Sequence, residues 1–232
     1  MIKILKSLIK KNPVLFKLWQ HVIYFIRSRQ FQGTAKYWEG RYKQGGNSGA
    51  SSYNRLAAFK ADVINSFVEK KNIATVIDFG CGDGNNLTLM KFPHYTGLDV
   101  SQTAIEICME KFKHDSSKSF FLYSSVTLDN KENLFKAQLS LSLDVIYHIM
   151  EDDLYDNYMQ RLFGAAEKYV IIYSKLEATR FAHHEKSRDF LKWIEINEPS
   201  FKLCNTIENR YKFDAKDPNN TSEASFYFFE RI

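Results

Sequence analysis

The segment VIDFGCGDG, residues 76–84, decides the fold of this 232-residue chain. Its apolar run ends in an acid, Asp78, and three of the ten glycines of the chain follow at alternate positions, 80, 82 and 84. Glycine permits backbone angles that other residues avoid, and it lets a ligand lie directly against the main chain. The segment therefore predicts a buried strand that ends in a glycine-rich turn with a ligand bound over it.

The glycine spacing and a second acid narrow the chemistry of that ligand. The dinucleotide fingerprint is G-x-G-x-x-G, whereas here Asn85 takes the place of the third glycine, and the Gly-Lys-Ser/Thr of a P-loop is absent. Asp99 ends the next apolar run, YTGLDVS, where a carboxylate can accept hydrogen bonds from both hydroxyls of a ribose. The two acids favour a ligand that contains a nucleoside. The alternatives are some other nucleotide-type ligand, or a tight turn that binds no ligand.

Strand and helix patterns alternate along the chain. We expect strands at 75–79, 95–100, 119–123, 139–146 and 169–173, and helices at 54–70, 84–92, 101–113, 151–165 and 184–196. Two further strand-like runs, 201–211 and 225–231, close the chain, whereas residues 37–53 are rich in turn residues. Alternation predicts an α/β fold with a parallel sheet covered by helices on both faces, and the last two runs predict an antiparallel hairpin at one edge.

Composition and net charge indicate the compartment of the protein and the kind of partner it binds. Hydrophobic residues make up 44% and charged residues 25%, as in soluble globular domains, and three widely spaced cysteines favour a reducing cytoplasm. The net charge is +5, but residues 1–30 hold seven basic residues and no acid, which leaves 25 basic against 27 acidic residues in the remainder. We therefore expect no nucleic-acid partner.

Residues 1–36 are predicted to form a basic amphipathic helical extension, with helices at 3–11 and 13–29. Lysines interrupt its apolar runs, no signal-peptide pattern is present, and the longest apolar run, 22–26, is too short to span a bilayer. A basic amphipathic helix can lie on an anionic membrane, which would place residues 1–30 at its inner face, or it can pack on protein. Both interpretations stay open.

The order of these motifs resembles the class I S-adenosylmethionine-dependent methyltransferases over roughly residues 37–232, which would form one domain. The resemblance implies a Rossmann-like, mostly parallel seven-stranded sheet with a C-terminal antiparallel hairpin and helices on both faces, and S-adenosyl-L-methionine as cofactor. The stretches YWEGRY, GGNSGASSY, SLDVIYHIMEDD and YVIIYS are similar to a narrower group, bacterial methyltransferases that accompany genes for surface polysaccharides.

The resemblance also implies roles for particular residues. The motif residues would hold the methionine part of the cofactor, Asp99 its ribose, and the two residues after the second and third strands its adenine. Asp144, at the end of the fourth strand, would lie near the methionine end or the transferring methyl. Aromatic residues and an arginine before the first strand would form a lid, with core packing as the alternative for the aromatics. The implied cofactor contacts are Tyr37, Trp38, Arg41, Tyr42, Asp78, Gly80, Cys81, Gly82, Asp99, Val100, Ser124 and Asp144.

Two histidines are candidates for acid–base chemistry. Transfer of a methyl group to a hydroxyl is helped by a base, and histidine is the usual base at neutral pH. His148 follows the fourth strand and would project over the cofactor, whereas His184 opens the helix predicted at 184–196. Each can instead serve as a capping or packing residue. The sequence has no H-x-x-x-H or C-x-x-C pattern, so no metal site is predicted.

These observations predict a cytoplasmic enzyme that methylates an oxygen of a sugar, a glycan precursor or a small phosphorylated intermediate during synthesis of bacterial surface polysaccharide. Its partner would be that small-molecule or glycan acceptor. Two alternatives stay open: a methyltransferase that acts on RNA or protein, and a scaffold that binds the cofactor without catalysis. An RNA or protein methyltransferase would transfer a labelled methyl group from the cofactor to a macromolecule, whereas a scaffold would transfer it to nothing.

Overall fold

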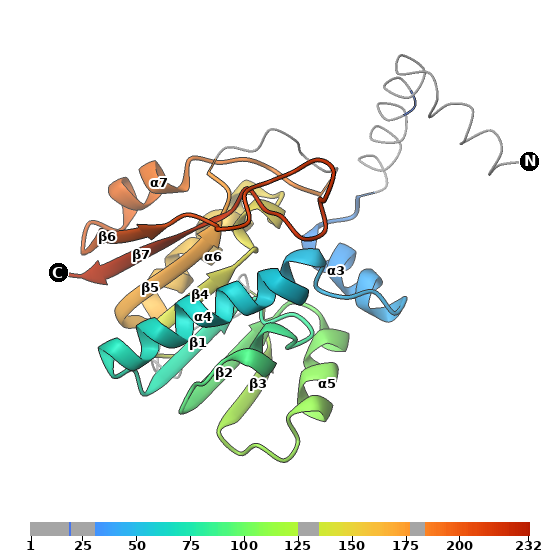
Figure 1. Cartoon of the computed structure of the whole chain (residues 1–232), viewed down its shortest axis with the longest axis horizontal. Coiled ribbons are helices and arrows are strands. Elements are labelled where there is room, and N and C mark those ends of the chain that lie inside the picture. Colours follow the sequence, from blue (N-terminus) through green and yellow to red (C-terminus); the bar gives the residue numbers. More distant parts are fainter. Residues whose placement is uncertain (1–18, 20–30, 125–134, 177–183) are drawn as a thin grey trace, which may run out of the picture.

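The computed structural model describes residues 19, 31–124, 135–176 and 184–232. Its strands are β1 (Thr75–Phe79), β2 (His94–Asp99), β3 (Lys118–Leu122), β4 (Ala137–Leu143), β5 (Ala166–Ser174), β6 (Phe201–Ile207) and β7 (Ser225–Arg231). They form one seven-stranded sheet in the order β3-β2-β1-β4-β5-β7-β6 (Figure 1). The first five strands run parallel, and β7 lies antiparallel between β5 and β6. The predicted parallel sheet with a closing antiparallel hairpin is confirmed.

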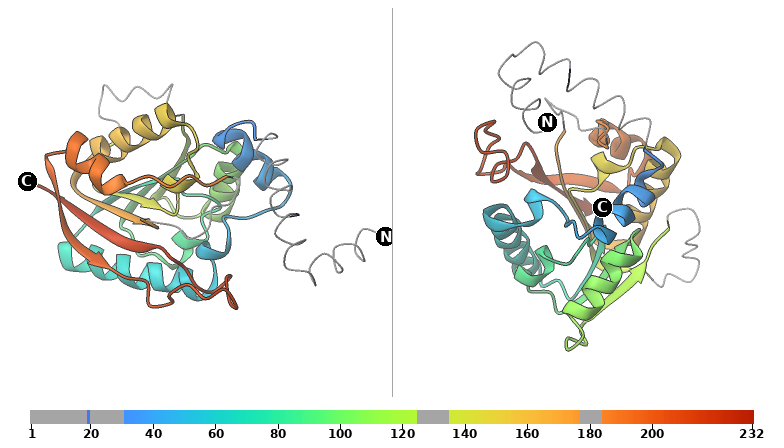
Figure 2. Two further views of the ribbon diagram at one scale, coloured as in Figure 1. Left: turned by 90° about the horizontal axis from the view of Figure 1, so that it is seen from above. Right: turned by 90° about the vertical axis from the view of Figure 1, so that its right-hand side faces the viewer.

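Helices cover both faces of the sheet (Figure 2). They are α3 (Thr34–Lys43), α4 (Asn54–Lys71), α5 (Gln102–Lys111), α6 (Asp152–Ala165) and α7 (Phe190–Asn197). Because side chains alternate along a strand, the central strands feed two separate cores. Ile171 of β5 packs with α4 and α5 on one face, and its neighbour Ile172 packs with α6 and α7 on the other. Near-continuous apolar runs such as YVII are what a strand buried on both faces requires.

Several predicted boundaries were wrong. In place of a helix over 84–92 there is only a 3-10 helix, Asn86–Leu89, which follows the left-handed backbone of Gly84. The fourth strand stops at Leu143 because Asp144 adopts a φ of +62°. The last helix begins at Phe190, where the side chain of Asp189 caps it by accepting from the backbone N–H of Lys192.

The segment before α4 contains more regular structure than predicted. Residues 34–43, part of which was taken as turn-rich, form helix α3, and turns follow only from Gln44 onward. The predicted helices at 3–11 and 13–29 fall outside the described residues except for Trp19, so the N-terminal extension stays a prediction. None of the helices in the described ranges is both long enough and apolar enough to cross a membrane.

Candidate functional site

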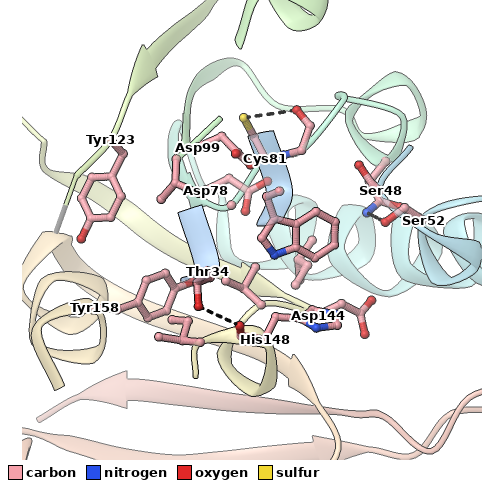
Figure 3. A pocket seen from close by; sticks show the side chains of 18 of the residues that line it. Thr34, Ser48, Ser52, Asp78, Cys81, Asp99, Tyr123, Asp144, His148 and Tyr158 are labelled. Atoms are coloured by element: carbon pink, nitrogen blue, oxygen red, sulfur yellow. Dashed lines mark hydrogen bonds between the residues drawn. The ribbon is translucent and has the colours of Figure 1, made fainter. Parts of the chain in front are cut away.

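A cavity opens beyond the carboxyl ends of β1, β2 and β4, where ligands bind in open parallel sheets (Figure 3). Side chains from all three strand ends and from α3 meet there. The wall includes most of the predicted site residues: Trp38, Tyr42, Asp78, Gly80, Cys81, Gly82, Asp99, Val100, Asp144 and His148. Ten of the predicted site residues therefore lie together at the carboxyl edge of the sheet.

The glycine loop forms the floor of this cavity. Gly80 and Gly82 have φ angles of +93° and +58°, and the backbone N–H of Gly80 donates to the carbonyl oxygen of Leu98 at 2.7 Å. A Cβ atom on Gly80 would lie 2.5 Å from Cγ2 of Val145, and one on Gly82 would collide with the hydroxyl of Ser48. Only glycine fits both positions, so the bare backbone faces the cavity.

Two buried thiols lie beneath the same loop. The Sγ of Cys108, on α5, lies 3.2 Å from the carbonyl oxygen of Gly82, and the Sγ of Cys81 lies 3.9 Å from it. The neighbouring Cys108 thiol and burial raise the pKa of Cys81, so the Cys81 thiol is protonated at neutral pH. The two thiols act as packing groups and weak donors under the loop.

Asp99 lies at the end of β2 with its carboxylate buried in the cavity wall. One oxygen accepts from the backbone N–H of Gly82 and the other from that of Ser101, both at 2.9 Å. Burial raises the pKa of Asp99 to about 6, although these two N–H groups oppose the rise. Each carboxylate oxygen can accept a further hydrogen bond, so a pair of neighbouring hydroxyls can bind here.

Asp78, at the end of the first strand's apolar run, carries an unsatisfied atom. Its Oδ2 accepts from the hydroxyl of Tyr95 at 2.9 Å, whereas its buried Oδ1 has no hydrogen-bond partner among the described residues. Burial raises the pKa of Asp78 to about 7, against the effect of the Tyr95 hydrogen bond. An unsatisfied buried oxygen is costly, so a donor or cation bound in the cavity beside it would be stabilised.

Asp144 lines the cavity, and three other side chains donate to its carboxylate. Its Oδ2 accepts from the ammonium of Lys60 at 2.8 Å and from the hydroxyl of Ser51 at 2.6 Å, and its Oδ1 accepts from the hydroxyl of Tyr147 at 2.9 Å. Three internal donors therefore occupy this carboxylate, and it stabilises the wall of the cavity from within. The sequence could not show this, because Lys60 lies 84 positions earlier.

Helix α3 supplies part of the predicted lid. Trp38 and Tyr42 line the cavity, and the hydroxyl of Tyr42 lies 2.9 Å from that of Ser48. Tyr37 stacks on His184 instead, and Arg41 donates from Nε to the carbonyl oxygen of Asn47 at 2.6 Å. Neither Tyr37 nor Arg41 belongs to the wall among the described residues.

The two residues after β3 differ in their position relative to the cavity. Ser124 is exposed and lies outside the cavity wall, whereas its neighbour Tyr123 is buried in that wall. The ring of Tyr123 meets Phe79 edge-on with centroids 5.5 Å apart. An aromatic residue directly after the third strand is the signal that could have identified this contact.

A buried contact that sequence reasoning missed holds α3 in place. The backbone N–H of Thr34 donates to Oε1 of Glu151 at 3.0 Å, and the Thr34 hydroxyl donates to Oε2 at 2.7 Å. Glu151 directly precedes α6, so it joins the start of α3 to the start of α6. Thr34 also lines the cavity.

Asp83, in the glycine loop, connects the floor of the cavity to the segment between α3 and α4. Asp83 accepts from the backbone N–H of Ser48 at 3.0 Å and from the hydroxyl of Tyr53 at 2.7 Å. The backbone N–H of Asp83 in turn donates to the Ser48 hydroxyl at 3.0 Å. Ser48 was not predicted as a site residue, and its small polar side chain is what lets the two segments approach.

The two candidate histidines meet at one side of the cavity. His148 lines the cavity, and its ring lies 5.2 Å from that of His184 at an interplanar angle of 13°. His184 is not part of the wall, and Trp38 meets His148 edge-on at 5.1 Å. Burial lowers the pKa of His148, although nearby Glu185 opposes this effect, so the imidazole is neutral at pH 7.

Comparison with known proteins rests on structure alone. No protein-family model matches this sequence, and no curated protein matches it. Three solved structures illustrate the similarity. The first is the N-methyltransferase NodS from Bradyrhizobium japonicum WM9 with S-adenosyl-L-homocysteine, which has a TM-score of 0.66 and 12% identity over 86% of this chain and 99% of that one.

The second is the magnesium protoporphyrin IX methyltransferase ChlM from Synechocystis PCC 6803 with bound SAH, with a TM-score of 0.60 and 14% identity over 77% of this chain and 85% of that one. The third is the methyltransferase domain of a bacterial Hen1 protein, with a TM-score of 0.58 and 22% identity over 74% of this chain and 97% of that one. The three are different methyltransferases by name, but they share one architecture. This chain has the Rossmann-like fold of the S-adenosylmethionine-dependent methyltransferases.

Proposed function

We propose that the chain is an S-adenosylmethionine-dependent methyltransferase that methylates an oxygen of a sugar, a glycan precursor or a small phosphorylated intermediate in the synthesis of bacterial surface polysaccharide. The observation that carries the first half of the proposal is the combination, in one cavity, of a bare glycine floor, the buried carboxylate of Asp99 and the unsatisfied oxygen of Asp78. These groups suit a nucleoside joined to a cationic amino acid.

Each wall element matches a part of that cofactor. The Asp99 carboxylate would accept hydrogen bonds from the ribose hydroxyls, and Val100 and Tyr123 would enclose the adenine. Gly80 and Gly82 would let the methionine part lie on the backbone, with Asp78 near its ammonium group. The bound cofactor would supply a methyl group on a sulfonium. An O–CH3 bond would form as the S–CH3 bond breaks with its electron pair left on sulfur, and the hydroxyl proton would pass to a base or to water.

The acceptor would enter beside α3, where rings surround the open side of the cavity. Trp38 and His148 present aromatic surfaces there, and His184 stacks behind them. Such surfaces pack against the apolar face of a sugar ring and exclude water from the reacting atoms. The near-neutral body of the chain fits a small acceptor better than a polyanion.

We also propose that the enzyme works in the cytoplasm and contacts the inner face of the membrane through residues 1–30, whose seven basic residues are balanced by no acid. Comparing the full chain with a variant that lacks residues 1–30 tests this. Binding to vesicles with anionic lipids should be lost in the truncated protein, whereas vesicles of neutral lipids should bind neither. Equal binding of both proteins to anionic vesicles would refute the membrane contact.

The experiment that tests the proposed activity uses methyl-labelled S-adenosylmethionine and fractions of a bacterial extract: nucleotide sugars and small phosphorylated metabolites, glycans, protein, and RNA. Label in a sugar-containing or small-metabolite fraction supports the proposal, and an Asp99→Asn variant should lose it. Label in RNA or protein would overturn the choice of acceptor. Failure of the purified chain to bind S-adenosyl-L-homocysteine in calorimetry would overturn the cofactor itself.

A further inference from the structure

Three side chains at the acceptor side of the cavity form a group that sequence spacing concealed. His148, His184 and Glu185 each offer one ligand atom, and these atoms all lie within 4.8 Å of one another. Two imidazoles and one carboxylate form the ligand set of many catalytic metal centres, which leave coordination positions open for water or substrate. We propose that these three residues bind one divalent transition-metal ion, with Zn²⁺ the best match to the donor set.

The orientation of His148 supports metal binding. Its Nδ1 lies 3.3 Å from the carbonyl oxygen of His184. A carbonyl oxygen can only accept, so Nδ1 carries the proton, and the lone pair of the neutral ring is on Nε2. Histidines that bind metals commonly donate their other ring N–H to a backbone carbonyl in this way, which fixes both the tautomer and the direction of the ring.

Aromatic rings contact both histidines, and metal binding needs a small rearrangement of the group. Tyr37 stacks on His184 with centroids 4.5 Å apart, and Trp38 meets His148 edge-on at 5.1 Å. Zn–N bonds of about 2.0–2.1 Å in a tetrahedral site place two ligand nitrogens about 3.3 Å apart. Metal binding therefore requires the three ligand atoms to move together by roughly an ångström or more, which rotation of the side chains can supply.

The side chain of Lys175 limits the affinity of this site for a metal ion. The ammonium of Lys175 lies 2.7 Å from Oε2 of Glu185, and both side chains are mostly buried. This ion pair positions the carboxylate, but the positive charge of Lys175 repels a dication. We therefore expect an affinity below that of a structural zinc site, in keeping with an ion that takes part in binding the acceptor.

The site has a consequence for the acceptor, and this part rests on the proposed function. His148 lines the cavity, so an ion held by the three residues would face the acceptor from the side opposite the glycine floor. Open positions on such an ion bind two neighbouring oxygen atoms well. The acceptor would then be a molecule with vicinal oxygens, such as a sugar diol or a hydroxyl beside a phosphate.

Titration of the purified, tag-free full chain with CoCl2 tests the site without any cofactor or acceptor. Co²⁺ bound by two imidazoles and a carboxylate gives visible absorption bands, so we expect saturation at one ion per chain and displacement by Zn²⁺. His184→Ala and Glu185→Gln, neither of which lines the cavity wall, should each weaken Co²⁺ binding by more than about tenfold.

The matched control is His114→Ala, because His114 is an exposed histidine outside the site. It should bind Co²⁺ as the unaltered chain does. Circular dichroism and binding of S-adenosyl-L-homocysteine, both measured without metal, show whether each variant is folded and whether the cofactor proposal holds by itself. The metal site is refuted if folded protein binds no Co²⁺ at one ion per chain, or if His184→Ala and Glu185→Gln bind it unchanged.

Discussion

The ammonium of Lys60 lies 2.8 Å from Oδ2 of Asp144 although the lysine side chain is fully buried. Removal of one partner from a buried ion pair leaves a charge without compensation, which costs about 3–5 kcal/mol. Lys60→Met should therefore reduce the free energy of unfolding by about that amount in urea denaturation. The exposed Lys70, on the same helix, provides the control, and Lys70→Met should leave stability nearly unchanged.

A second substitution distinguishes the charge from the packing of Lys60. Adding Asp144→Asn to Lys60→Met removes the uncompensated charge, and asparagine tolerates the φ of +62° at this position. The double variant should be more stable than Lys60→Met alone. If it is less stable by the full sum of both single effects, the two residues do not interact as the structure indicates.

Binding of S-adenosyl-L-homocysteine should depend on pH through Asp99, whose pKa is raised to about 6 by burial. Ribose hydroxyls stabilise the ionised carboxylate, so the pKa of Asp99 falls in the complex and a proton is released on binding. Affinity should therefore rise with pH up to about 6 and then level off with respect to this group. Calorimetry from pH 5 to pH 8 measures the change.

The Asp99→Asn variant is the control for this dependence, because it keeps the shape of the side chain and removes its titration. Its affinity should be much lower and should retain only the pH dependence of Asp78, whose pKa is raised by burial to about 7. Unaltered affinity in Asp99→Asn would contradict the assignment of Asp99 to the ribose.

Gly82→Ala should lose both stability and binding. Its φ of +58° is strained for alanine, at a cost of about 1–3 kcal/mol, and the added methyl would displace Ser48 from the loop. Gly164, inside α6, has open space around its Cα, so Gly164→Ala should stabilise the chain by about 0.5–1 kcal/mol. Thermal unfolding with and without S-adenosyl-L-homocysteine separates the two losses, and a Gly82→Ala protein that binds normally would show that the loop is not the floor of the site.

Glu151→Ala should loosen helix α3. The substitution removes two acceptors of Thr34 and leaves, among the described residues, only the weaker contact of its hydroxyl with the carbonyl oxygen of His148 at 3.2 Å. Amide hydrogens of α3 should therefore exchange faster, and S-adenosyl-L-homocysteine should bind several-fold more weakly. Asp153 lies in the first turn of α6, is exposed, and has the same charge, which makes Asp153→Ala the matched control. Equal exchange of α3 amides in the two variants would mean that Glu151 does not hold this helix.

Local patterns predicted the framework of the fold well. The bounds of β1 and β7 agree with the sequence prediction residue for residue, because apolar runs between turn signals are read directly. Asp99 was found in the same way, since the end of a parallel strand defines where its last side chain lies. The glycine loop was identifiable because Gly80, Gly82 and Gly84 all have positive φ angles, which favour glycine. Three glycines at alternate positions are therefore a distinctive sequence pattern.

Contacts between distant residues were not predictable by these means. The three donors to Asp144 come from Ser51, Lys60 and Tyr147, and no periodicity connects them. Helix α3 was missed because its apolar face, which includes Trp38 and Tyr42, is short and interrupted by charged residues. The group of His148, His184 and Glu185 escaped a search for short motifs because a strand and a helix separate its members along the chain.

The thiols beneath the glycine loop give this protein a built-in chemical probe. Cys81 and Cys108 are buried, whereas Cys204 is exposed. A thiol reagent in excess modifies the exposed Cys204 at once, but it reaches Cys81 and Cys108 only when the glycine loop opens. The ratio of their modification rate in the folded chain to that in an unfolded chain gives the free energy of this local opening. If the proposed nucleoside binds over the loop, it should slow those two reactions and not the first. Occupancy of the site would then be measurable by counting labelled cysteines in a mass spectrum, without any knowledge of the acceptor.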